Sequence, residues 1–359
     1  MNWNPTYIKA AEVCLPSGYN VETAFHSMLE GQVFYSKVQA NPHPEFFPAM
    51  LFEPRLTDFY RSCYQVANAL LPKLGIRQFE PDTQLIFCST KGDIDAKTVE
   101  EKKLWFSAKR IQEKLGLNPL PIVVSSACIS GVSGIGLAAR MLQNKSAKRV
   151  LVLGADVFSE FTFSGFHAFK ALSMDLCRPF DKDRSGLNLG EGFAAVLIDT
   201  EPENALAEIC GFAQSNDANH ISGPSRDGSG LKQAIERTLS CTQVKPDEVD
   251  LLCAHGTATL YNDEMESLAF ESMAIEAPLI SFKCYTGHTL GASGVVETVL
   301  GLEAMKQGKI PANLHTTHPG TTGKIKASSQ PLPSSMTYML KTASGFGGCN
   351  AALLLKNMQ

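Results

Sequence analysis

The amino-acid sequence predicts an α/β fold made of two related halves. Runs of β-branched and other apolar residues at 121–128, 149–156 and 194–199 are each followed by a turn or a helix signal, as expected for buried strands. A similar alternation returns later in the chain, and small residues open a helix in both parts, at 128–142 and 287–305. This recurrence indicates an internal duplication.

In the first half, residues 131–149 place apolar side chains at helical spacing and end in basic residues, as a helix packed on a sheet would. With its flanking strands this segment forms a strand–helix–strand unit. Weaker signals precede it. Residues 20–32 and 60–76 are expected to be helices, and 83–93 a strand that leads into a loop.

The second half is expected to contain strands at 249–256, 277–285, 336–344 and 351–356. A helix is expected at 291–309. The segment 200–208 is polar and contains proline, so we expect the chain to divide there into domains 1–203 and 204–359.

The composition excludes several classes of protein. Of 359 residues, 44% are hydrophobic and 19% are charged, which is typical of a globular protein with a large core. The formal charge of −4 gives no field that attracts nucleic acid or an anionic membrane. The sequence has neither a leader-like N-terminus nor a long apolar run, so a cytoplasmic protein without membrane insertion is expected.

Neither a metal site nor a disulfide framework is predicted. The 10 cysteines are dispersed, without a C-x-x-C pair. His315 and His318 lie in a turn-rich stretch with no acidic or cysteine ligand beside them. These two histidines are therefore expected to lie in a solvated loop.

The stretch SSACISGVSGIG at 125–136 suits two different chemistries. Its glycines, Gly131, Gly134 and Gly136, are spaced G-x-x-G-x-G, whereas a dinucleotide-binding turn needs G-x-G-x-x-G directly after a strand. Cys128 follows a predicted strand and precedes a predicted helix, where the positive end of the helix dipole favours a thiolate. This cysteine is the candidate nucleophile, although the position also suits a purely structural thiol.

Two histidines in the other half accompany the cysteine. His255 ends the strand VDLLCA, and His288 lies where a predicted strand passes into a helix. Functional sites of α/β folds commonly form at strand ends. The pair is therefore expected to manage proton and charge for a cysteine that forms a thioester.

Together these residues resemble the β-ketoacyl synthases. The stretches SSACISG, RPFDKDRSGLNLGEGFAAVLI, CAHGTATLYND, FKCYTGHTLGASG and SGFGGCNAALLLK are similar to motifs of that family and occur in its order across residues 125–356. DANHISGPSRDGSG at 217–230 is similar to a loop of the family. The resemblance implies a thiolase fold, in which two similar α/β halves form a five-layer αβαβα sandwich.

The resemblance also implies a reaction. Cys128 takes an acyl chain from a thioester on the phosphopantetheine of an acyl carrier protein or on coenzyme A, and no other cofactor is implied. His255 and His288 then assist the loss of CO₂ from a malonyl thioester. The carbanion attacks the acyl-cysteine and gives a 3-oxoacyl thioester, for fatty acid, polyketide or polyene synthesis, including pigments of the aryl polyene kind. Neutral imidazole N–H groups suit this step because they donate hydrogen bonds to the developing enolate.

Supporting roles follow from the same resemblance. The backbone N–H groups of Cys128 and Phe346 match an oxyanion hole. Lys283 and Glu266 match a supporting ion pair that orients the histidines. The remaining correspondences are hydroxyl groups that hold the pantetheine arm, Thr257 and Thr259, and glycines of the closing loop, Gly345, Gly347 and Gly348.

The implied partners are an acidic acyl carrier protein and a second subunit, either identical or another ketosynthase-like chain. A basic docking patch is expected, with candidates at 101–110 and 145–149. Two alternatives stay open: a thiolase or acyltransferase, for which Cys349 is the candidate second cysteine, and a non-catalytic chain-length subunit. The histidine pair disfavours the first, and the retained nucleophile disfavours the second.

Overall fold

The computed structural model describes residues 3–39, 44–56, 58–220 and 223–359. Over these residues the largest sheet is 11-stranded, in the order β13-β11-β10-β15-β16-β9-β1-β8-β6-β4-β5. Its strands from the first half are β1 (Thr6–Cys14), β4 (Gln84–Cys88), β5 (Ile122–Val124), β6 (Val150–Asp156) and β8 (Gly192–Asp199). Its strands from the second half are β9 (Ala207–Asn216), β10 (Leu251–Cys253), β11 (Pro278–Ile280), β13 (Lys326–Ala327), β15 (Tyr338–Gly345) and β16 (Cys349–Asn357).

Each half of this sheet has the same topology. When the strands of each half are numbered in chain order, both read 3-2-4-5-1 from the outer edge inward, apart from the extra strand β13. In both, the pairs nearest the outer edge are parallel, and those nearest the junction are antiparallel. The halves join where β1 pairs with β9 over a few residues. This symmetry confirms the predicted internal duplication.

The helices connect and cover these strands. They are α1 (Val21–Leu29), α2 (Phe59–Asn68), α3 (Leu70–Leu74), α4 (Leu104–Lys114), α5 (Ser130–Gln143), α6 (Glu160–Ala168), α7 (Ser229–Ser240), α8 (Leu260–Ser272), α9 (Lys283–Thr286) and α10 (Ser293–Gln307). Two smaller sheets accompany the largest sheet. One contains β2 (Ser36–Gln39), β3 (Phe46–Met50) and β7 (Leu189–Gly190), and the other contains β12 (Lys309–Ile310) and β14 (Leu332–Pro333). Within the described ranges, no helix combines the length and the apolar character needed to cross a membrane.

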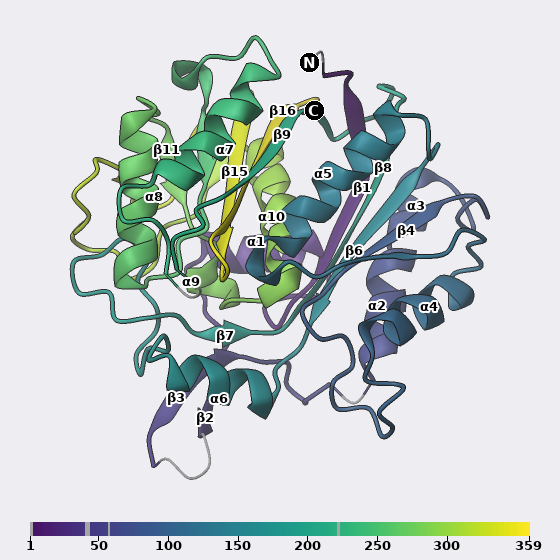
Figure 1. Ribbon diagram of the computed structural model, residues 1–359, viewed down its shortest axis with the longest axis horizontal. Helices are drawn as coiled ribbons and strands as arrows, with labels where there is room; N and C mark the ends of the chain where they lie inside the picture. Colours follow the sequence, from purple (N-terminus) through teal and green to yellow (C-terminus); the bar gives the residue numbers. More distant parts are fainter. Residues whose placement is uncertain (1–2, 40–43, 57, 221–222) are drawn as a thin grey trace.

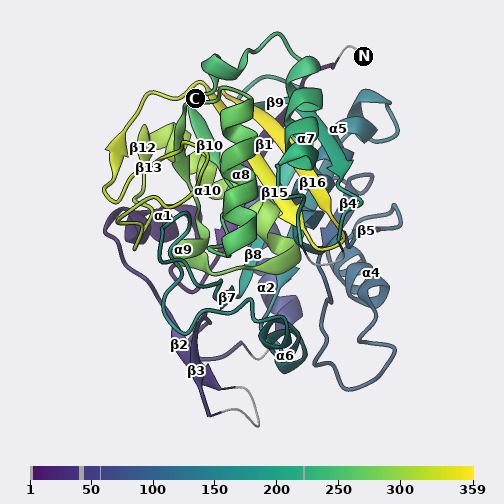
Figure 2. The same ribbon diagram turned by 60° about the vertical axis from the view of Figure 1, so that its left-hand side comes forward.

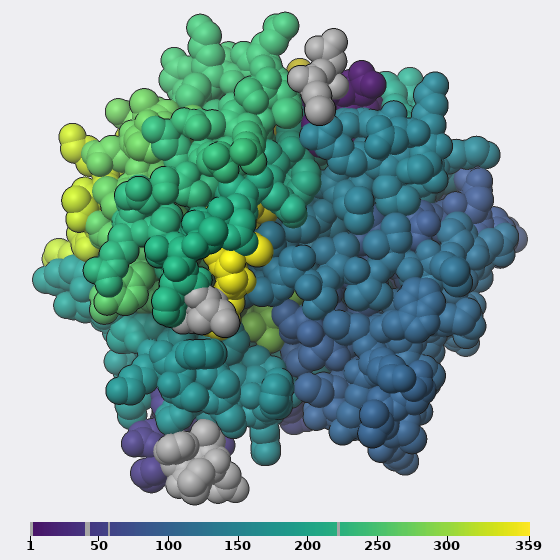
Figure 3. All heavy atoms as spheres, in the orientation of Figure 1, coloured from purple at the N-terminus to yellow at the C-terminus, as the bar shows by residue number. Residues whose placement is uncertain are grey.

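Figure 1 shows these elements in five layers. Helices α5 and α10 contact each other between the two half-sheets. Helices α2 and α4 cover the outer face of the first half-sheet, and α7 and α8 cover that of the second, where Figure 2 shows them in front of β15 and β16. The two halves, purple to teal and green to yellow, lie side by side in Figure 3. The expected five-layer αβαβα sandwich of the thiolase fold is confirmed.

The strands are buried on both faces, which explains their continuous apolar runs. In β6, Val150 and Val152 face the inner core between the half-sheets, whereas Leu151 and Leu153 face the outer core under α2 and α4. The second half-sheet divides its side chains in the same way. The inner core therefore holds α5 and α10 between the two half-sheets. The predicted nucleophile, Cys128, and His288 lie just before the N-termini of these helices.

Two parts of the structure differ from the sequence-based expectation. The strand expected at 277–285 ends at Ile280, and Lys283–Thr286 form helix α9. Backbone N–H groups of Tyr285 and Thr286 donate to the carbonyl oxygen of Phe282, and this turn buries Lys283. The strands β1 and β9 were not predicted, because charged residues interrupt their apolar pattern.

The glycines at 131, 134 and 136 serve packing between elements. A Cβ on Gly131 would lie 2.5 Å from the backbone nitrogen of Val295, and one on Gly294 would lie 2.3 Å from that of Val132. A Cβ on Gly134 or Gly136 would overlap side chains of neighbouring strands. Gly131 and Gly294 let α5 and α10 approach closely, and Gly134 and Gly136 let α5 lie against the strands, which removes the remaining reason to consider a dinucleotide-binding loop.

Replacing Gly131 with alanine is expected to lower the free energy of unfolding by about 1–3 kcal/mol, because the added Cβ must push the two helices apart. Gly165→Ala on α6 is the matched control, since nothing lies within 4 Å of its Cβ position. Urea denaturation of both variants checks the expectation. Equal stability of the two variants would contradict the role given to Gly131.

Candidate active site

The candidate nucleophile lies in a constrained turn. Cys128 is part of a 3₁₀ turn, Ala127–Ile129, between β5 and α5. Ala127 has φ of 49°, which a non-glycine residue adopts only when its surroundings impose it. The Ser130 hydroxyl accepts from the N–H of Ser126 at 2.8 Å and donates to the carbonyl oxygen of Ala127 at 2.6 Å. The turn therefore holds the sulfur in one direction.

The duplicated topology places His288 opposite this cysteine. His288 precedes a second 3₁₀ turn, Leu290–Ala292, which leads into α10 as the first leads into α5. Leu290 has φ of 51°, matching the unusual conformation in the first turn. Because α5 and α10 are in contact near their N-termini, Nε2 of His288 lies 3.0 Å from Sγ of Cys128.

Burial of Cys128 acts against the thiolate that the helix dipole favours. Burial raises the pKa of Cys128 to about 12, and the opposing effect of the Lys283 ammonium group is smaller. The dipole depends on local sequence, whereas desolvation of the thiolate depends on how much of the fold covers the sulfur. A base must therefore take the thiol proton, and Nε2 of His288 is within hydrogen-bond distance.

The surroundings of His288 suit a base. Burial, followed by the charges of Lys283 and Lys341, holds the pKa of His288 well below its usual range, so the ring is neutral. Its Nδ1 lies 3.0 Å from the Ser293 hydroxyl, which is 3.1 Å from that of Thr289. A hydroxyl group donates and accepts, so Ser293 can bond Nδ1 in either tautomer.

His255 lies two residues after the end of β10, the strand beside β11. Burial, and then the charge of Lys283, holds the pKa of His255 well below its usual range. Nζ of Lys283 lies 3.2 Å from Nδ1 of His255 and 2.6 Å from its carbonyl oxygen. Because an ammonium group only donates, Nδ1 accepts and the ring proton is on Nε2. A ring nitrogen of each histidine and Sγ of Cys128 all lie within 4.8 Å of one another.

Lys283 pairs with a different glutamate from the one expected. Its Nζ lies 2.5 Å from Oε1 of Glu297 on α10. Glu266 on α8 instead accepts from the backbone N–H groups of His255 and Gly256, at 2.8 and 2.6 Å. The expected Lys283–Glu266 ion pair is wrong, because α10 packs over β10 and β15 and brings Glu297 to the ammonium group. Glu266 supports the backbone of His255.

The glycine loop lies directly against the nucleophile. A Cβ on Gly345 would be 3.3 Å from the backbone nitrogen of Cys128. Gly347 and Gly348 follow with positive φ, 86° and 73°, which turn β15 back into β16. Phe346, between Gly345 and Gly347, has a partly exposed ring. This ring contacts those of Phe166 on α6 and Phe169 just after it, with centroids 5.5 and 5.6 Å apart.

The loop at 217–230 is tied to the glycine loop. The N–H of Asp217 donates to the carbonyl oxygen of Gly348 at 2.8 Å, and the Asn350 amide donates to Oδ1 of Asp217 at 2.6 Å. Residues 221 and 222 of the predicted loop lie outside the described residues. The contacts made by Asp217 join the two loops on one side of the site.

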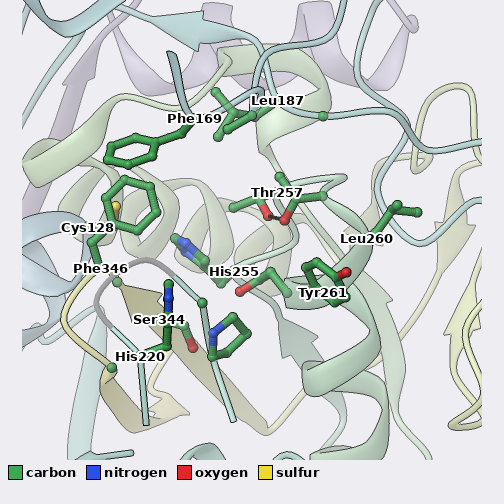
Figure 4. Close-up of a pocket in the computed structure, with 18 of the residues that line it drawn as sticks. Cys128, Phe169, Leu187, His220, His255, Thr257, Leu260, Tyr261, Ser344 and Phe346 are labelled. Atoms are coloured by element: carbon green, nitrogen blue, oxygen red, sulfur yellow. Dashed lines mark hydrogen bonds between the residues drawn. The ribbon is translucent and has the colours of Figure 1, made fainter. Parts of the chain in front are cut away.

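A cavity of about 580 Å³ leads from the surface to the cysteine and both histidines. Figure 4 shows Cys128 and Phe346 on one side of this cavity and Tyr261 on the other, with His255 and Thr257 between them. The hydroxyl groups of Thr257 and Thr259 line its wall, 2.9 Å apart. A cavity of this size accommodates an extended small substrate.

Other predicted residues do not line this cavity. In the candidate patch 145–149, Lys148 is 3.4 Å from Asp82 and Arg149 is 2.9 Å from Glu80. In the patch 101–110, lysines also pair with neighbouring glutamates. Cys349 is not among the residues described as lining the cavity, and its sulfur lies 3.3 Å from the Asn216 amide nitrogen.

Three functional residues were missed by sequence reasoning: Glu297, Ser293 and Lys341. Glu297 and Lys341 are charged residues inside otherwise apolar segments, VVETVL and YMLKTA, and both are buried. A charge within an apolar run is the signal that identifies such residues, because burial of an unpaired charge is costly. Ser293 follows His288 by five residues and offers no comparable signal.

Two family matches cover most of the chain. Residues 75–204 match the family described as Beta-ketoacyl synthase, N-terminal domain, and residues 206–317 match Beta-ketoacyl synthase, C-terminal domain. The chain is 34% identical over 253 residues to the 3-oxoacyl-[acyl-carrier-protein] synthase 2 of Synechocystis sp., covering 65% of this chain and 61% of that protein. It is 32% identical over 276 residues to the 3-oxoacyl-[acyl-carrier-protein] synthase homolog of Saccharomyces cerevisiae, covering 70% of this chain and 62% of that protein. These matches span less than two thirds of the relatives' own lengths.

Solved structures share the fold over almost the whole chain. A chain of the complex of the ketosynthase ApeO with its chain length factor ApeC, from Xenorhabdus doucetiae, has a TM-score of 0.88 at 23% identity, covering 99% of this chain and 98% of that one. The beta-ketoacyl synthase from Burkholderia phymatum has a TM-score of 0.89 at 20% identity, covering 99% and 100%. With the order of the motifs, the duplicated topology and the two family matches, these findings establish that the chain belongs to the β-ketoacyl synthase family.

Proposed function

We propose that this chain is a 3-oxoacyl-[acyl carrier protein] synthase, which condenses an acyl thioester with a malonyl unit on an acyl carrier protein and releases CO₂. The observation that carries the proposal is the 3.0 Å contact between Cys128 Sγ and His288 Nε2, with the neutral ring of His255 beside them. The names of the relatives, 3-oxoacyl-[acyl-carrier-protein] synthases, support the same reaction.

In the first step, His288 Nε2 accepts the thiol proton of Cys128 while Sγ attacks the thioester carbonyl carbon. The backbone N–H groups of Cys128 and Phe346 bind the tetrahedral oxygen. The close approach of the Gly345 backbone to Cys128 supports this oxyanion hole. When the substrate C–S bond breaks, the leaving thiolate takes the proton from His288. The products are acyl-Cys128 and a free pantetheine thiol.

In the second step, the malonyl thioester loses CO₂ and negative charge develops on its thioester oxygen. The Nε2–H group of His255 donates to that oxygen, and its position is set by the bond from Lys283 to Nδ1. His288 donates from Nε2 in its other tautomer, with Ser293 donating to Nδ1. The enolate carbon attacks the acyl carbonyl carbon, the new C–C bond forms, and Cys128 Sγ leaves and is reprotonated from solvent.

Lys283 and Glu266 orient groups and transfer no proton in this proposal. Lys283 fixes the tautomer of His255, and Glu266 holds the backbone N–H groups of His255 and Gly256. Thr257 and Thr259 hold the pantetheine arm of the carrier, which is supported by their hydroxyl groups on the cavity wall. Gly345, Gly347 and Gly348 shape the loop that closes over the acyl-cysteine.

We further propose that the carrier protein and a second subunit complete the assembly. Edge strand β5 has half-buried side chains, which supports pairing with an identical or ketosynthase-like subunit. The acyl-carrier protein seen with its ketosynthase in the AntDE:AntF complex, and the ApeO–ApeC pair, support both kinds of partner. The patches 101–110 and 145–149 remain carrier-docking candidates, and some of their basic side chains pair with carboxylates nearby.

The units of this chain are proposed to be 1–203 and 204–359, one for the nucleophile and one for the histidines and the glycine loop. The break at 203 falls between β8 and β9, which supports this division. The position of Cys349 outside the described cavity lining gives a two-cysteine thiolase reaction no support. The Cys128–His288 contact likewise gives no support to the alternative of a non-catalytic chain-length subunit.

The test combines purified protein with acyl carrier thioesters of several chain lengths and then malonyl carrier protein, followed by intact-protein mass. A mass gain equal to the acyl group, lost on addition of malonyl carrier with formation of a 3-oxoacyl product, is expected. Acylation without elongation would instead favour acyl transfer or a missing subunit. The absence of an adduct with every chain length would contradict the proposal.

A further inference from the structure

A second lysine is buried beside the site, and no step above uses it. Lys341 lies on β15 with none of its surface exposed. Its Nζ is 2.6 Å from Oε2 of Glu297, an ion pair, and donates to the carbonyl oxygen of Thr342 at 2.6 Å. The carbonyl oxygens of Cys253 and Ala254, directly before His255, are 3.4 and 3.5 Å away. Lys341 therefore touches the strand end that presents His255.

Lys341 completes a balanced group of charges. Glu297 is shared, with Oε1 on Lys283 at 2.5 Å and Oε2 on Lys341 at 2.6 Å. Glu266 joins through the hydroxyl of Thr342, which donates to its Oε1 at 2.9 Å. We call Lys283, Lys341, Glu266 and Glu297 the buried charge cluster. Its two ammonium and two carboxylate groups sum to zero charge, which the low-dielectric interior favours.

The cluster acts on both histidines. Lys283 bonds Nδ1 of His255, and Glu297 holds Lys283 in that place. Burial is the main cause that lowers the pKa of each histidine, and the charges of Lys283 and Lys341 add to it. For His255, the neighbouring His288 also lowers the pKa, by more than Lys341 does. Burial alone would lower the pKa of Lys341, but Glu297 outweighs it and the pKa is raised, so the lysine stays charged.

We propose that Lys341 is a positioning residue: it balances the buried charge cluster and fixes Glu297, and through Glu297 and Lys283 it orients His255. The inference rests on the proposed condensation. The carboxylate of Glu297 binds two ammonium groups at once, so its two oxygens set the separation between β15, which carries Lys341, and α9, which carries Lys283. A single lysine would leave one oxygen of the buried carboxylate without a partner.

Loss of Lys341 changes the charge state of the site. Without this ammonium group, the cluster keeps one ammonium group, Lys283, and two carboxylates, Glu266 and Glu297, so it carries one net negative charge. A buried net negative charge favours the uptake of a proton by a neighbouring group, so the imidazole of His255 becomes easier to protonate. The pKa of His255 therefore rises. Since the neutral ring is the active form, loss of rate on acidification would begin at a higher pH.

The test uses the whole chain and three variants. Lys341→Met keeps the length of the side chain and removes its charge. Lys73→Met is the matched control, because Lys73 also pairs with a buried carboxylate, Glu12 at 3.0 Å, and does not line the described cavity. The double variant Lys341→Met/Glu297→Gln removes one charge of each sign, so the cluster is neutral again.

Decarboxylation of malonyl carrier protein is measured between about pH 5 and 8. Lys341→Met is expected to lower kcat about 10–100-fold with KM unchanged. The acid limb of the pH profile, where the rate falls on acidification, is expected to move to higher pH. Lys73→Met should match the wild type. In the double variant the acid limb should return toward its wild-type position, while kcat stays low because Lys283 has lost Glu297.

A second readout needs no substrate: NMR titration of the His255 ring in the wild type and in Lys341→Met. A higher pKa of His255 in the variant is expected, and an unchanged pKa would overturn the inference, as would a wild-type rate and pH profile. If Lys341→Met shows no cooperative unfolding, Lys341→Gln replaces it with the same expectations. A folded wild type without decarboxylation would overturn the proposed function instead, and the titration would still decide the role of Lys341.

Discussion

Cys128→Ala should abolish acylation and lower the rate of condensation by about 10⁴-fold or more, because the only atom that bonds the acyl group is removed. The substitution deletes one buried sulfur atom and keeps the methylene carbon, so the turn Ala127–Ile129 and its Ser130 hydrogen bonds should persist. Decarboxylation of malonyl carrier should also persist, since the histidines and not the sulfur stabilise the enolate.

Intact-protein mass with acyl carrier thioesters measures the first effect, and CO₂ release measures the second. Cys63→Ala is the matched control, because Cys63 is also a buried thiol, on α2 in the outer core. It should keep both activities. An acyl adduct on Cys128→Ala would show that another residue is the nucleophile, and the assignment of the cavity would fail with it.

His255→Ala should lower decarboxylation and condensation by about 10²–10³-fold while the acylation of Cys128 continues. The substitution removes the Nε2–H donor for the enolate, whereas the base for the thiol proton, His288, keeps its 3.0 Å contact with Sγ. His288→Ala is expected to impair both steps, because His288 serves as the base in one and as a donor in the other.

Single-turnover acylation followed by a malonyl chase separates these steps. His26→Ala is the control, since His26 is exposed and pairs with Glu30 on the surface. Loss of acylation in His255→Ala to the same degree as in His288→Ala would contradict the division of labour between the rings. Unchanged decarboxylation in His255→Ala would exclude this ring as the enolate donor.

Much of the site could be predicted because its residues carry local signals. Cys128 and His255 come soon after apolar strands, and His288 lies in a small-residue segment just before α10. The partner of Lys283 could not be found this way. Its distance to Glu297 or Glu266 depends on which helix packs over β10 and β15, and no local pattern encodes that choice.

The protonation state of Cys128 likewise could not be predicted from local sequence. A helix dipole is a local property that follows from sequence position, and it favours a thiolate. The energetic cost of removing a thiolate from water depends on every element that covers the sulfur, and it raises the pKa to about 12. The larger, non-local effect prevails. The cysteine consequently depends on His288 from the other half of the chain.

Short-range patterns in the sequence were enough to predict the α/β class, the duplication and the family resemblance, and to single out the candidate nucleophile and its two histidines, because strand and helix periodicity and motif order are carried by neighbouring residues. Folding added what depends on distance in space: the 3-2-4-5-1 order in both half-sheets, the α5–α10 contact through Gly131 and Gly294, and the balance of Lys283, Lys341, Glu266 and Glu297. Charge pairing and desolvation act between residues far apart in the chain, so these properties arise only when the two halves pack together.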